Sequence, residues 1–440
     1  MKKIILIIID GLGDTPVPQL DNKTPLEAAK TPNLDFLVQN GTCGLVEPFK
    51  FSSQEKPESD TCHLAIFGYD PNIYYLGRGP YEAAGIGINL KEGDLALRAN
   101  FATVDKNLIV IDRRAGRIEE TQSLIRALNE IKIKGIKFFL KKSFGHRAVL
   151  VIRGKNLSDK ISDSDPHKIG FELKNIVPLD KTREANFTAG VLNEFLNQAH
   201  QILASHPLNK ERDAKGLLPA NCILTRGAGF FKKTPSFKEM YGLKAACIAG
   251  GALYKGIAKI LGMDLVKVRG ANGFINTNLK GKFLAARKIL RQGKERFFQN
   301  VNKENLKPKN YKKYDFVFLH IKAADSLAED GNFQGKKEFI EKIDENIKFL
   351  LAGSNKKSKT KIPQTENLSD TLIVVTGDHT TSCQLKSHSS EPVPILIWGS
   401  GIKQKEVINK FSERECQNGD LGKIEALSLM KKILGLANKK

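Results

Sequence analysis

Three short apolar runs of the sequence are each followed by side chains that could bind a divalent metal ion. These side chains are Asp10 after residues 4–9, Asp325 after residues 316–321, and Asp378 with His379 after residues 372–376. If the runs are parallel strands, their carboxyl ends meet at one edge of a sheet, where ligands bind. Carboxylate oxygens and imidazole nitrogens held by rigid elements are the ligands that divalent metals require. A single aspartate could instead cap a helix, but three such ends together favour a metal site.

Ser59, in the segment Glu58–Ala65, is a candidate nucleophile. It follows Pro57 and precedes an apolar stretch, so we expect Ser59 or Asp60 to begin a helix. A hydroxyl at a helix N-terminus suits phosphoryl chemistry, because the free N–H groups favour an arriving anion, and a metal would activate it for covalent catalysis. Ser59 could equally be a capping serine. The sequence leaves both interpretations open.

Arginines recur near turns that contain glycine or aspartate. They are Arg78, Arg113, Arg114, Arg147 (which follows His146) and Arg226. Arginine binds phosphate and carboxylate in a bidentate manner, although each one alone could be a solvated surface residue. Nucleotide-binding motifs are weak, because Gly11-Leu12-Gly13 lacks the third glycine of the dinucleotide pattern and no GxxxxGK[ST] occurs.

Elements of two kinds must position these residues. The runs 4–9, 316–321, 372–376 and 393–398 are rich in branched apolar residues and predict strands buried on both faces. Amphipathic helical patterns separate them, such as 336–351. Another helix is predicted after Thr24, which forms a capping-box pattern with Glu27 around Pro25. Buried strands that alternate with helices predict an α/β fold with a mostly parallel sheet.

The middle of the chain differs from its two ends. It combines shorter strand-like pieces, such as 148–152, with charged turns and one strong helical pattern around 188–203. We therefore expect a smaller α+β domain, residues 96–215, inserted into a discontinuous domain formed by residues 1–95 and 216–440. Lysine-rich stretches at 306–313, at 353–362 and at the C-terminus predict solvated loops or tails.

Composition excludes several classes of protein. Of the 440 residues, 41% are hydrophobic and 27% are charged, which is typical of a globular chain and not of a disordered one. The six cysteines contain no CxxC pair, which argues against a disulfide framework or a zinc ribbon. No run of 18 apolar residues occurs, and the apolar run near the N-terminus is too short for a signal peptide. These features predict a cytoplasmic protein that does not bind a membrane.

The net charge of +22 indicates anionic partners in general. The lysine runs lack interleaved aromatic residues, so nucleic-acid binding is not predicted. A membrane surface and phosphorylated metabolites are other anionic partners, and the net charge does not distinguish between them.

In this order, the candidate motifs resemble the archaeal-type cofactor-independent phosphoglycerate mutases of the alkaline phosphatase superfamily. The resemblance covers nearly the whole chain and includes KTPLEAAKTPNLD, ESDTCHLAIFGYDP, GRGPYEAAGIGI, RANFAT, DRRAGRI, HRAVLV, PANCILTRGAG and TGDHTTSCQLKSHSSEPVPILI. It implies an alkaline-phosphatase-like sheet with an inserted substrate-enclosing domain. It also implies interconversion of 3- and 2-phosphoglycerate through a phosphoserine, without 2,3-bisphosphoglycerate, in a monomer or homo-oligomer.

The resemblance also implies site residues. One divalent ion would be bound by Asp10, Ser59, Asp378 and His379, and a second by Asp325, Glu329 and His388. Catalytic roles would belong to Ser59, Lys322, Asp112 and Arg113. Substrate-binding roles would belong to His63, Arg78, Arg114, His146, Arg147 and Arg226.

The chain departs from the family pattern at the second metal site. Glu329 stands four residues after Asp325, where the family has a histidine, and Asn272 and Asn276 replace the expected threonine and aspartate. A carboxylate at Glu329 still suits a hard ion, so Mg²⁺ or Mn²⁺ is expected. The alternatives are a metal-dependent phosphohydrolase or other phosphomutase of the same superfamily, a degraded non-catalytic paralogue, and a basic nucleic-acid-binding protein.

Overall fold

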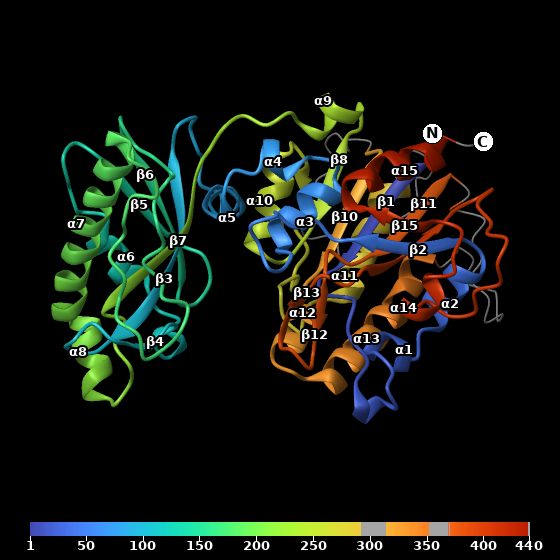
Figure 1. Cartoon of the computed structure of the whole chain (residues 1–440), viewed down its shortest axis with the longest axis horizontal. Helices are drawn as coiled ribbons and strands as arrows, with labels where there is room; N and C mark the ends of the chain where they lie inside the picture. The colour runs from blue at the N-terminus through green and yellow to red at the C-terminus, as the bar shows by residue number, and fades with distance from the viewer. Residues whose placement is uncertain (292–313, 352–367, 369, 439–440) are drawn as a thin grey trace, which may run out of the picture. The chain divides into compact units, whose positions relative to one another are not determined.

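The computed structural model describes residues 1–291, 314–351, 368 and 370–438, and the chain divides into two compact units (Figure 1). The first unit comprises Met1–Tyr75 and Pro235–Lys440, and the second comprises Leu76–Thr234. The second unit extends beyond the expected limits of 96 and 215 at both ends. The reason is that helix α5 (Arg78–Gly85) and strand β7 (Cys222–Phe230) both pack against strand β3 (Leu95–Val104).

Eight strands form the sheet of the first unit, in the order β15-β2-β14-β11-β1-β10-β8-β9. Their bounds are β1 Lys3–Ile9, β2 Thr42–Glu47, β8 Ala245–Ile248, β9 Asp264–Leu265, β10 Phe316–Ile321, β11 Thr371–Thr376, β14 Val393–Trp398 and β15 Gly422–Glu425. Of these eight, β14 alone runs against its neighbours. The predicted α/β fold with a mostly parallel sheet is therefore confirmed, as are its four predicted strands.

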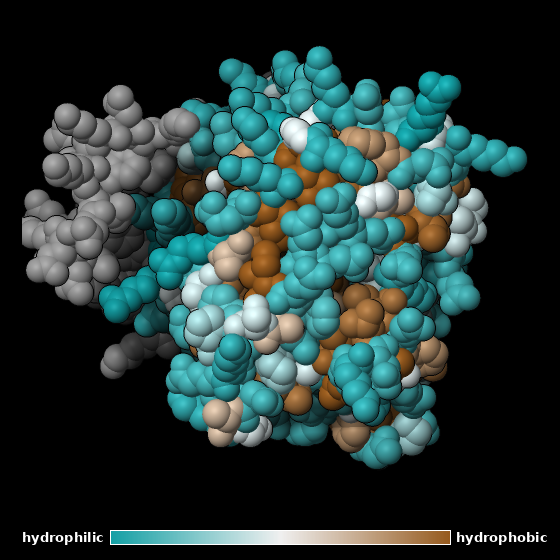
Figure 2. Space-filling view, turned by 90° about the vertical axis from the view of Figure 1, so that its left-hand side faces the viewer, coloured by the Kyte–Doolittle hydropathy of each residue, from teal (hydrophilic) through white to brown (hydrophobic). Residues whose placement is uncertain are grey.

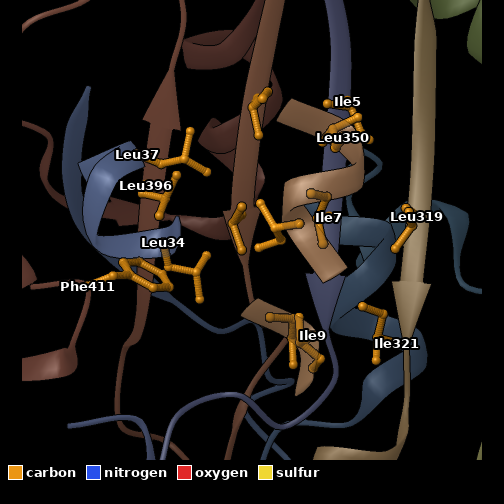
Figure 3. Packing of buried hydrophobic residues seen from close by; sticks show 14 of the residues in the cluster. Ile5, Ile7, Ile9, Leu34, Leu37, Leu319, Ile321, Leu350, Leu396 and Phe411 are labelled. Atoms are coloured by element: carbon orange, nitrogen blue, oxygen red, sulfur yellow. The ribbon is translucent and has the colours of Figure 1, made fainter. Parts of the chain in front are cut away.

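Helices cover both faces of this sheet. Ile5, Ile7 and Ile9 of β1 pack in one core with α2 (Pro32–Gln39), α11 (Leu279–Arg291) and α13 (Phe333–Leu351), as Figure 3 shows in part. On the other face, Phe318 of β10 lies edge-on to Phe67, which directly follows α3 (Ser59–Ile66). Helix α3 in turn contacts α10 (Ala252–Ile260) and α15 (Ala426–Asn438). This double cover explains why the strands read as unbroken apolar runs.

The second unit contains an antiparallel sheet in which β3 pairs with three strands. They are β4 (Val110–Asp112), β6 (Arg147–Arg153) and β7, and β6 also pairs with β5 (Lys137–Lys142). One face of the sheet packs against α7 (Arg183–Ser205) through residues such as Phe101 and Phe195. The predicted helix at 188–203 is thus confirmed, and it begins earlier because Thr182 caps it, accepting a hydrogen bond from the backbone of Ala185.

Shorter elements complete the two units. They are α1 Pro25–Ala28, α4 Pro71–Tyr74, α6 Gln122–Leu128, α8 Pro207–Ala214, α9 Phe237–Tyr241, α12 Ala323–Glu329, α14 Glu413–Cys416, β12 Thr380–Ser382, β13 Ser387–Ser389, and 3-10 turns at Pro18–Leu20 and Ala115–Arg117. The capping box of Thr24 and Glu27 is confirmed. The lysine-rich stretches 306–313 and 353–362 lie outside the described residues.

The surface and the cysteines agree with the composition. Figure 2, which looks at the side that carries α7, shows a mostly hydrophilic face with smaller apolar patches between polar residues. All six cysteines are buried and unpaired. None of the described helices combines the length and the apolar character needed to cross a lipid bilayer.

Candidate active site

Two neighbouring parallel strands bring the first group of candidate ligands together. Asp10 follows β1, and Asp378 and His379 follow β11, so all three meet at one sheet edge. The Nε2 atom of His379 lies 3.8 Å from Oδ1 of Asp10 and 3.3 Å from Oδ2 of Asp378. All three residues are buried, and one ligand atom of each lies within 4.8 Å of the others. This group can hold one cation.

Ser59 lies directly beside this group. Its Oγ atom is 3.0 Å from Nε2 of His379, and the residue is almost fully buried. Ser59 is the first residue of α3, whereas the capping position belongs to Glu58, whose side chain makes no capping hydrogen bond. The interpretation of Ser59 as a capping serine is therefore wrong. Its hydroxyl is available for chemistry at the start of a helix, where the backbone dipole favours an anion.

A second group of candidate ligands shares His379 with the first. Asp325 on α12 and His388 on β13 approach each other, with 3.4 Å between Oδ1 of Asp325 and Nε2 of His388, and the rings of His379 and His388 stack at 3.8 Å. Ligand atoms of Asp325, His379 and His388 lie within 4.8 Å of one another. The side chain of Glu329 is 53% exposed, and its Oε1 atom lies 4.0 Å from Nε2 of His388. Glu329 thus lies at the rim of this group.

Lys322 joins the two groups. Its ammonium lies 3.3 Å from Oδ1 of Asp10 and donates a hydrogen bond to Oδ2 of Asp325. The backbone at residue 11 lies close to the backbone of Asp325. Only glycine fits there, because Gly11 has a φ of +64° and a Cβ atom would lie 2.8 Å from the Cα atom of Asp325. The sequence motif Asp10-Gly11 therefore has a structural reason. Glycine lets the chain that follows the first carboxylate lie against the second.

The pKa values of the two carboxylates of the first group are shifted in opposite directions. Burial raises the pKa of Asp10, but the charge of Lys322 and the contact with His320 together outweigh burial and hold the pKa well below its usual value. Burial, followed by the negative charge of Asp10, raises the pKa of Asp378 to about 7. The buried Oδ2 atom of Asp378 accepts no hydrogen bond. A cation bound there would stabilise the charged carboxylate, so the donor set fits a divalent metal.

The two histidines also differ. Burial and then His388 lower the pKa of His379 to about 4, so its ring is neutral and can bind a metal. Burial would lower the pKa of His388, but its contact with Asp325 dominates and raises the pKa to about 9. A metal at the second group must displace this proton.

Two side chains that were not predicted from the sequence contact the carboxylate of Asp10. The Tyr254 hydroxyl donates a hydrogen bond to Oδ2 of Asp10, and Nε2 of His320 lies 3.2 Å from the same oxygen. His320 interrupts an otherwise apolar strand, which is a signal that could have found it. Tyr254 gave no such signal, because it lies on α10, far from Asp10 along the chain.

His63, expected to bind substrate, has a different setting. It is completely buried on α3, with Nδ1 2.6 Å from the backbone oxygen of Ser59 and 3.4 Å from Oδ2 of Asp378. Its ring also packs against Phe318. This position lets His63 support Asp378 and Ser59, and its expected contact with substrate stays a prediction.

Arginines gather on the face of β3 that points away from α7. Arg98 lies opposite Arg226 of β7, and Asn100 lies opposite Arg147 of β6. Arg98 is 7% exposed, and the Nε atoms of Arg98 and Arg226 have no hydrogen-bond partner. Arg147 and Arg226 were expected to bind substrate, whereas Arg98 was not predicted because it lies inside a strand and not beside a turn.

One buried carboxylate, Glu82, faces several of these arginines. It lies 3.3 Å from Nε of Arg78 and 3.8 Å from Nη1 of Arg98. Burial raises the pKa of Glu82, but Arg98 and Arg78 outweigh burial and leave it low. Burial and neighbouring guanidinium groups hold the pKa of Arg98 well below its ordinary value. Positive charge exceeds negative charge on this face, which suits a bound anion.

Of the remaining predicted residues of the second unit, Asp112 ends β4, Arg113 and Arg114 follow it, and His146 directly precedes β6. Arg113 forms a bidentate pair with Asp165, at 3.0 Å and 2.6 Å, so its charge is balanced. Asp112 accepts a hydrogen bond from the backbone N–H of Arg114. Burial and then the positive charges of Arg147, Arg114 and Arg98 lower the pKa of His146 to about 4.

Known proteins are similar in sequence to this chain along almost its whole length. It is 43% identical over 439 residues to the 2,3-bisphosphoglycerate-independent phosphoglycerate mutase 1 of Methanocaldococcus jannaschii, covering 99% of this chain and 98% of the relative. The relative of the same name from Archaeoglobus fulgidus is also 43% identical, over 440 residues, with the same coverage.

Two solved structures are also similar to this chain in sequence and fold. A Pyrococcus horikoshii protein is 32% identical, with a TM-score of 0.79 over 100% of this chain and 98% of that one. The cofactor-independent phosphoglycerate mutase of Thermoplasma acidophilum is 34% identical, with a TM-score of 0.66 over both complete chains. A family model described as 2,3-bisphosphoglycerate-independent phosphoglycerate mutase matches residues 38–209. The chain therefore belongs to the family of 2,3-bisphosphoglycerate-independent phosphoglycerate mutases.

Proposed function

We propose that this protein interconverts 3-phosphoglycerate and 2-phosphoglycerate without 2,3-bisphosphoglycerate, by way of a phosphoserine at Ser59. Family membership supports the reaction. The observation that carries the role of Ser59 is its position, with Oγ 3.0 Å from Nε2 of His379 beside the carboxylates of Asp10 and Asp378. A nucleophilic hydroxyl next to a cation site is the arrangement that phosphoryl transfer requires.

Two divalent cations, Mg²⁺ or Mn²⁺, complete the site in this proposal. Asp10, Asp378 and His379 hold one cation together with Ser59, and Asp325 and His388 hold the other, with Glu329 at its rim. Bound cations would supply positive charge for the hydroxyl of Ser59 and for the phosphoryl oxygens. The carboxylate donors, Glu329 among them, favour Mg²⁺ or Mn²⁺ over softer ions.

The reaction then takes two half-steps at Ser59. In the first, a bond forms between Oγ and phosphorus as the bond between phosphorus and the 3-oxygen of the substrate breaks, and the proton lost by Ser59 ends on that oxygen. In the second, the 2-hydroxyl of the retained glycerate takes the phosphoryl group, and its proton returns to Ser59. Lys322 stabilises the charge that develops on the transferring group.

The second unit binds the anionic parts of the substrate in this proposal. Arg78, Arg98, Arg147 and Arg226 supply positive charge in excess of Glu82. Asp112, Arg113, Arg114 and His146 hold the glycerate while it turns, which distinguishes a mutase from a hydrolase. A hydrolase has no need to retain the dephosphorylated product.

A coupled assay tests the proposal. Purified protein with Mg²⁺ or Mn²⁺ and 3-phosphoglycerate, but without 2,3-bisphosphoglycerate, should form 2-phosphoglycerate, detected through enolase, faster than it releases inorganic phosphate. A chelator should stop the reaction, and re-added metal should restore it. Phosphate release that outpaces isomerisation would instead identify a phosphohydrolase, and a requirement for 2,3-bisphosphoglycerate would contradict the proposal.

A further inference from the structure

Three buried aromatic rings lie next to the carboxylates of the first cation site. We call His63, Tyr254 and His320 the ring layer. The rings of Tyr254 and His320 stack at 3.5 Å with an interplanar angle of 20°, and His63 lies 4.9 Å from Tyr254 and 5.1 Å from His320. The nucleophile, cation and anion roles proposed above leave Tyr254 and His320 without a function.

The two carboxylate oxygens of Asp10 have different neighbours, and only one of them contacts the ring layer. Oδ2 accepts a hydrogen bond from the Tyr254 hydroxyl and lies 3.2 Å from Nε2 of His320. Oδ1 faces the other way, 3.3 Å from Nζ of Lys322 and 3.8 Å from Nε2 of His379. A carboxylate can only accept, so the phenolic proton must point at Oδ2. The hydrogen bond therefore determines which oxygen faces the cation site.

We infer that Tyr254 is a positioning residue that orients Asp10 toward the first cation. Side chains that hydrogen-bond a metal ligand from outside fix its orientation and commonly strengthen metal binding. The inference rests on the cation site of the proposed function, but it does not depend on which reaction follows. His320 stacks on Tyr254 and so limits the movement of its ring.

The start of α10 also constrains Tyr254. A Cβ atom at Gly251 would lie 2.9 Å from Cδ2 and 3.0 Å from Cε2 of the Tyr254 ring. Gly251 has φ −76° and ψ 148°, a conformation that alanine also adopts. A Gly251→Ala substitution should therefore displace the ring without removing a hydroxyl or a candidate ligand.

The test is a Mn²⁺ titration of the full chain, with free Mn²⁺ measured by electron paramagnetic resonance and no substrate present. We expect Tyr254→Phe to weaken binding at the first site by about 10- to 100-fold, and Gly251→Ala to weaken it in the same direction by less. Asp378→Asn identifies which class of bound Mn²⁺ belongs to the first site. Tyr241→Phe is the matched control, because its hydroxyl donates to the backbone oxygen of Phe67.

The possible outcomes separate this inference from the proposed function. Equal Mn²⁺ affinity in Tyr254→Phe, Tyr241→Phe and the unchanged protein would overturn the inference, even if the enzyme turns over. Tight Mn²⁺ binding that Tyr254→Phe weakens would support it, even if the protein shows no mutase activity. Thermal unfolding with chelator present shows whether the Tyr254→Phe variant is folded. If it is not folded, the Mn²⁺ affinity of the Gly251→Ala variant is compared with that of the control instead.

Discussion

Two histidines show how differently the two units of this molecule are charged. His388 in the first unit has a pKa of about 9, because its contact with Asp325 outweighs the effect of burial. His146 in the second unit has a pKa of about 4, because burial and three arginines all disfavour its proton. The same side chain is thus a cation in one unit at neutral pH and neutral in the other.

The difference extends to the groups around each histidine. The first unit buries Asp10, Asp325 and Asp378 with Lys322 as the nearby ammonium. The second buries Arg98 among other arginines with Glu82 as the facing carboxylate. The buried charges of the two units therefore suit partners of opposite sign, which the proposal assigns as a cation for the first unit and an anion for the second. The net charge of +22 conceals this division.

The largest expected effect belongs to the first unit. Ser59→Ala should lower mutase turnover by about a millionfold, as removal of a catalytic nucleophile does. In the described part of the chain Ser59 places its hydroxyl 3.0 Å from Nε2 of His379, whereas the Thr381 hydroxyl lies 3.2 Å from the other ring nitrogen, Nδ1. The enolase-coupled assay measures the loss, and Ser53→Ala, at an exposed position, is the control. Binding of phosphate by the second unit should not change. Residual turnover within tenfold of the unchanged protein would argue against a phosphoserine.

The next effect belongs to the second unit. Arg98→Met should raise KM for 3-phosphoglycerate by roughly 10- to 100-fold, the equivalent of a charge-assisted hydrogen bond of about 1.5–3 kcal/mol, while Mn²⁺ affinity stays the same. Steady-state kinetics and a Mn²⁺ titration measure the two quantities. Arg153→Met is the matched control, since Arg153 pairs with Asp94 on the same sheet. Equal KM values for both variants would remove Arg98 from the proposed binding face.

The opposite pKa shifts of the two histidines lead to a prediction about pH. Relative to the usual 6.5, the stability contributed by His388 is fully present below about pH 6.5 and is lost as pH rises through about 9. The effect of His146 runs the other way, because stability is lost as pH falls from 6.5 through about 4. Mg²⁺ should displace the proton of His388, and phosphate should raise the pKa of His146 by about one unit.

Nuclear magnetic resonance of histidine carbons, with His388→Asn and His146→Asn for assignment, measures both titrations. We expect each histidine to respond to one ligand and not to the other. If both titrate near 6.5, or if Mg²⁺ and phosphate shift the same resonance, the contrast between the two units fails.

The smallest effect is expected at the rim of the second cation group. Glu329→His should shift metal preference at that group toward Zn²⁺ and Co²⁺ by several-fold, because imidazole is a softer donor than carboxylate. The effect is small because the Glu329 side chain is 53% exposed and lies 4.0 Å from Nε2 of His388. Mutase rates with Mg²⁺, Mn²⁺, Co²⁺ and Zn²⁺ measure it. Activity that appears only in Glu329→His would mean that the natural chain has lost its function.

The sequence predicted most of the first site because strand ends mark it. Asp10, Asp378 and His379 follow apolar runs, and parallel strands bring such positions together. Tyr254, His320 and Arg98 escaped prediction for a different reason. Tyr254 lies inside a helix and Arg98 inside a strand, without distinctive neighbours in the sequence. His320 does interrupt an apolar strand, but it lies far from Asp10 along the chain.

The domain limits were harder to predict for a related reason. Residues 76–95 and 216–234 join the second unit because α5 and β7 pack on β3, a contact between distant segments. No change in composition marks it. The roles of the individual arginines, Asp112 and Arg113 stay predictions, because they depend on how substrate binds.

The order of strands in the first sheet has a consequence for the newly made chain. Both neighbours of β1, which are β10 and β11, come from the last third of the sequence, whereas every strand of the second sheet lies between Leu76 and Thr234. During synthesis the second sheet can close while β1 still lacks both partners. Asp10 and Ser59 leave the ribosome long before Asp378, His379 and His388. If the proposed sites are right, a chain that stops before these residues has the arginines of the second sheet but lacks three of the proposed cation ligands, so metal binding would distinguish a finished molecule from an interrupted one.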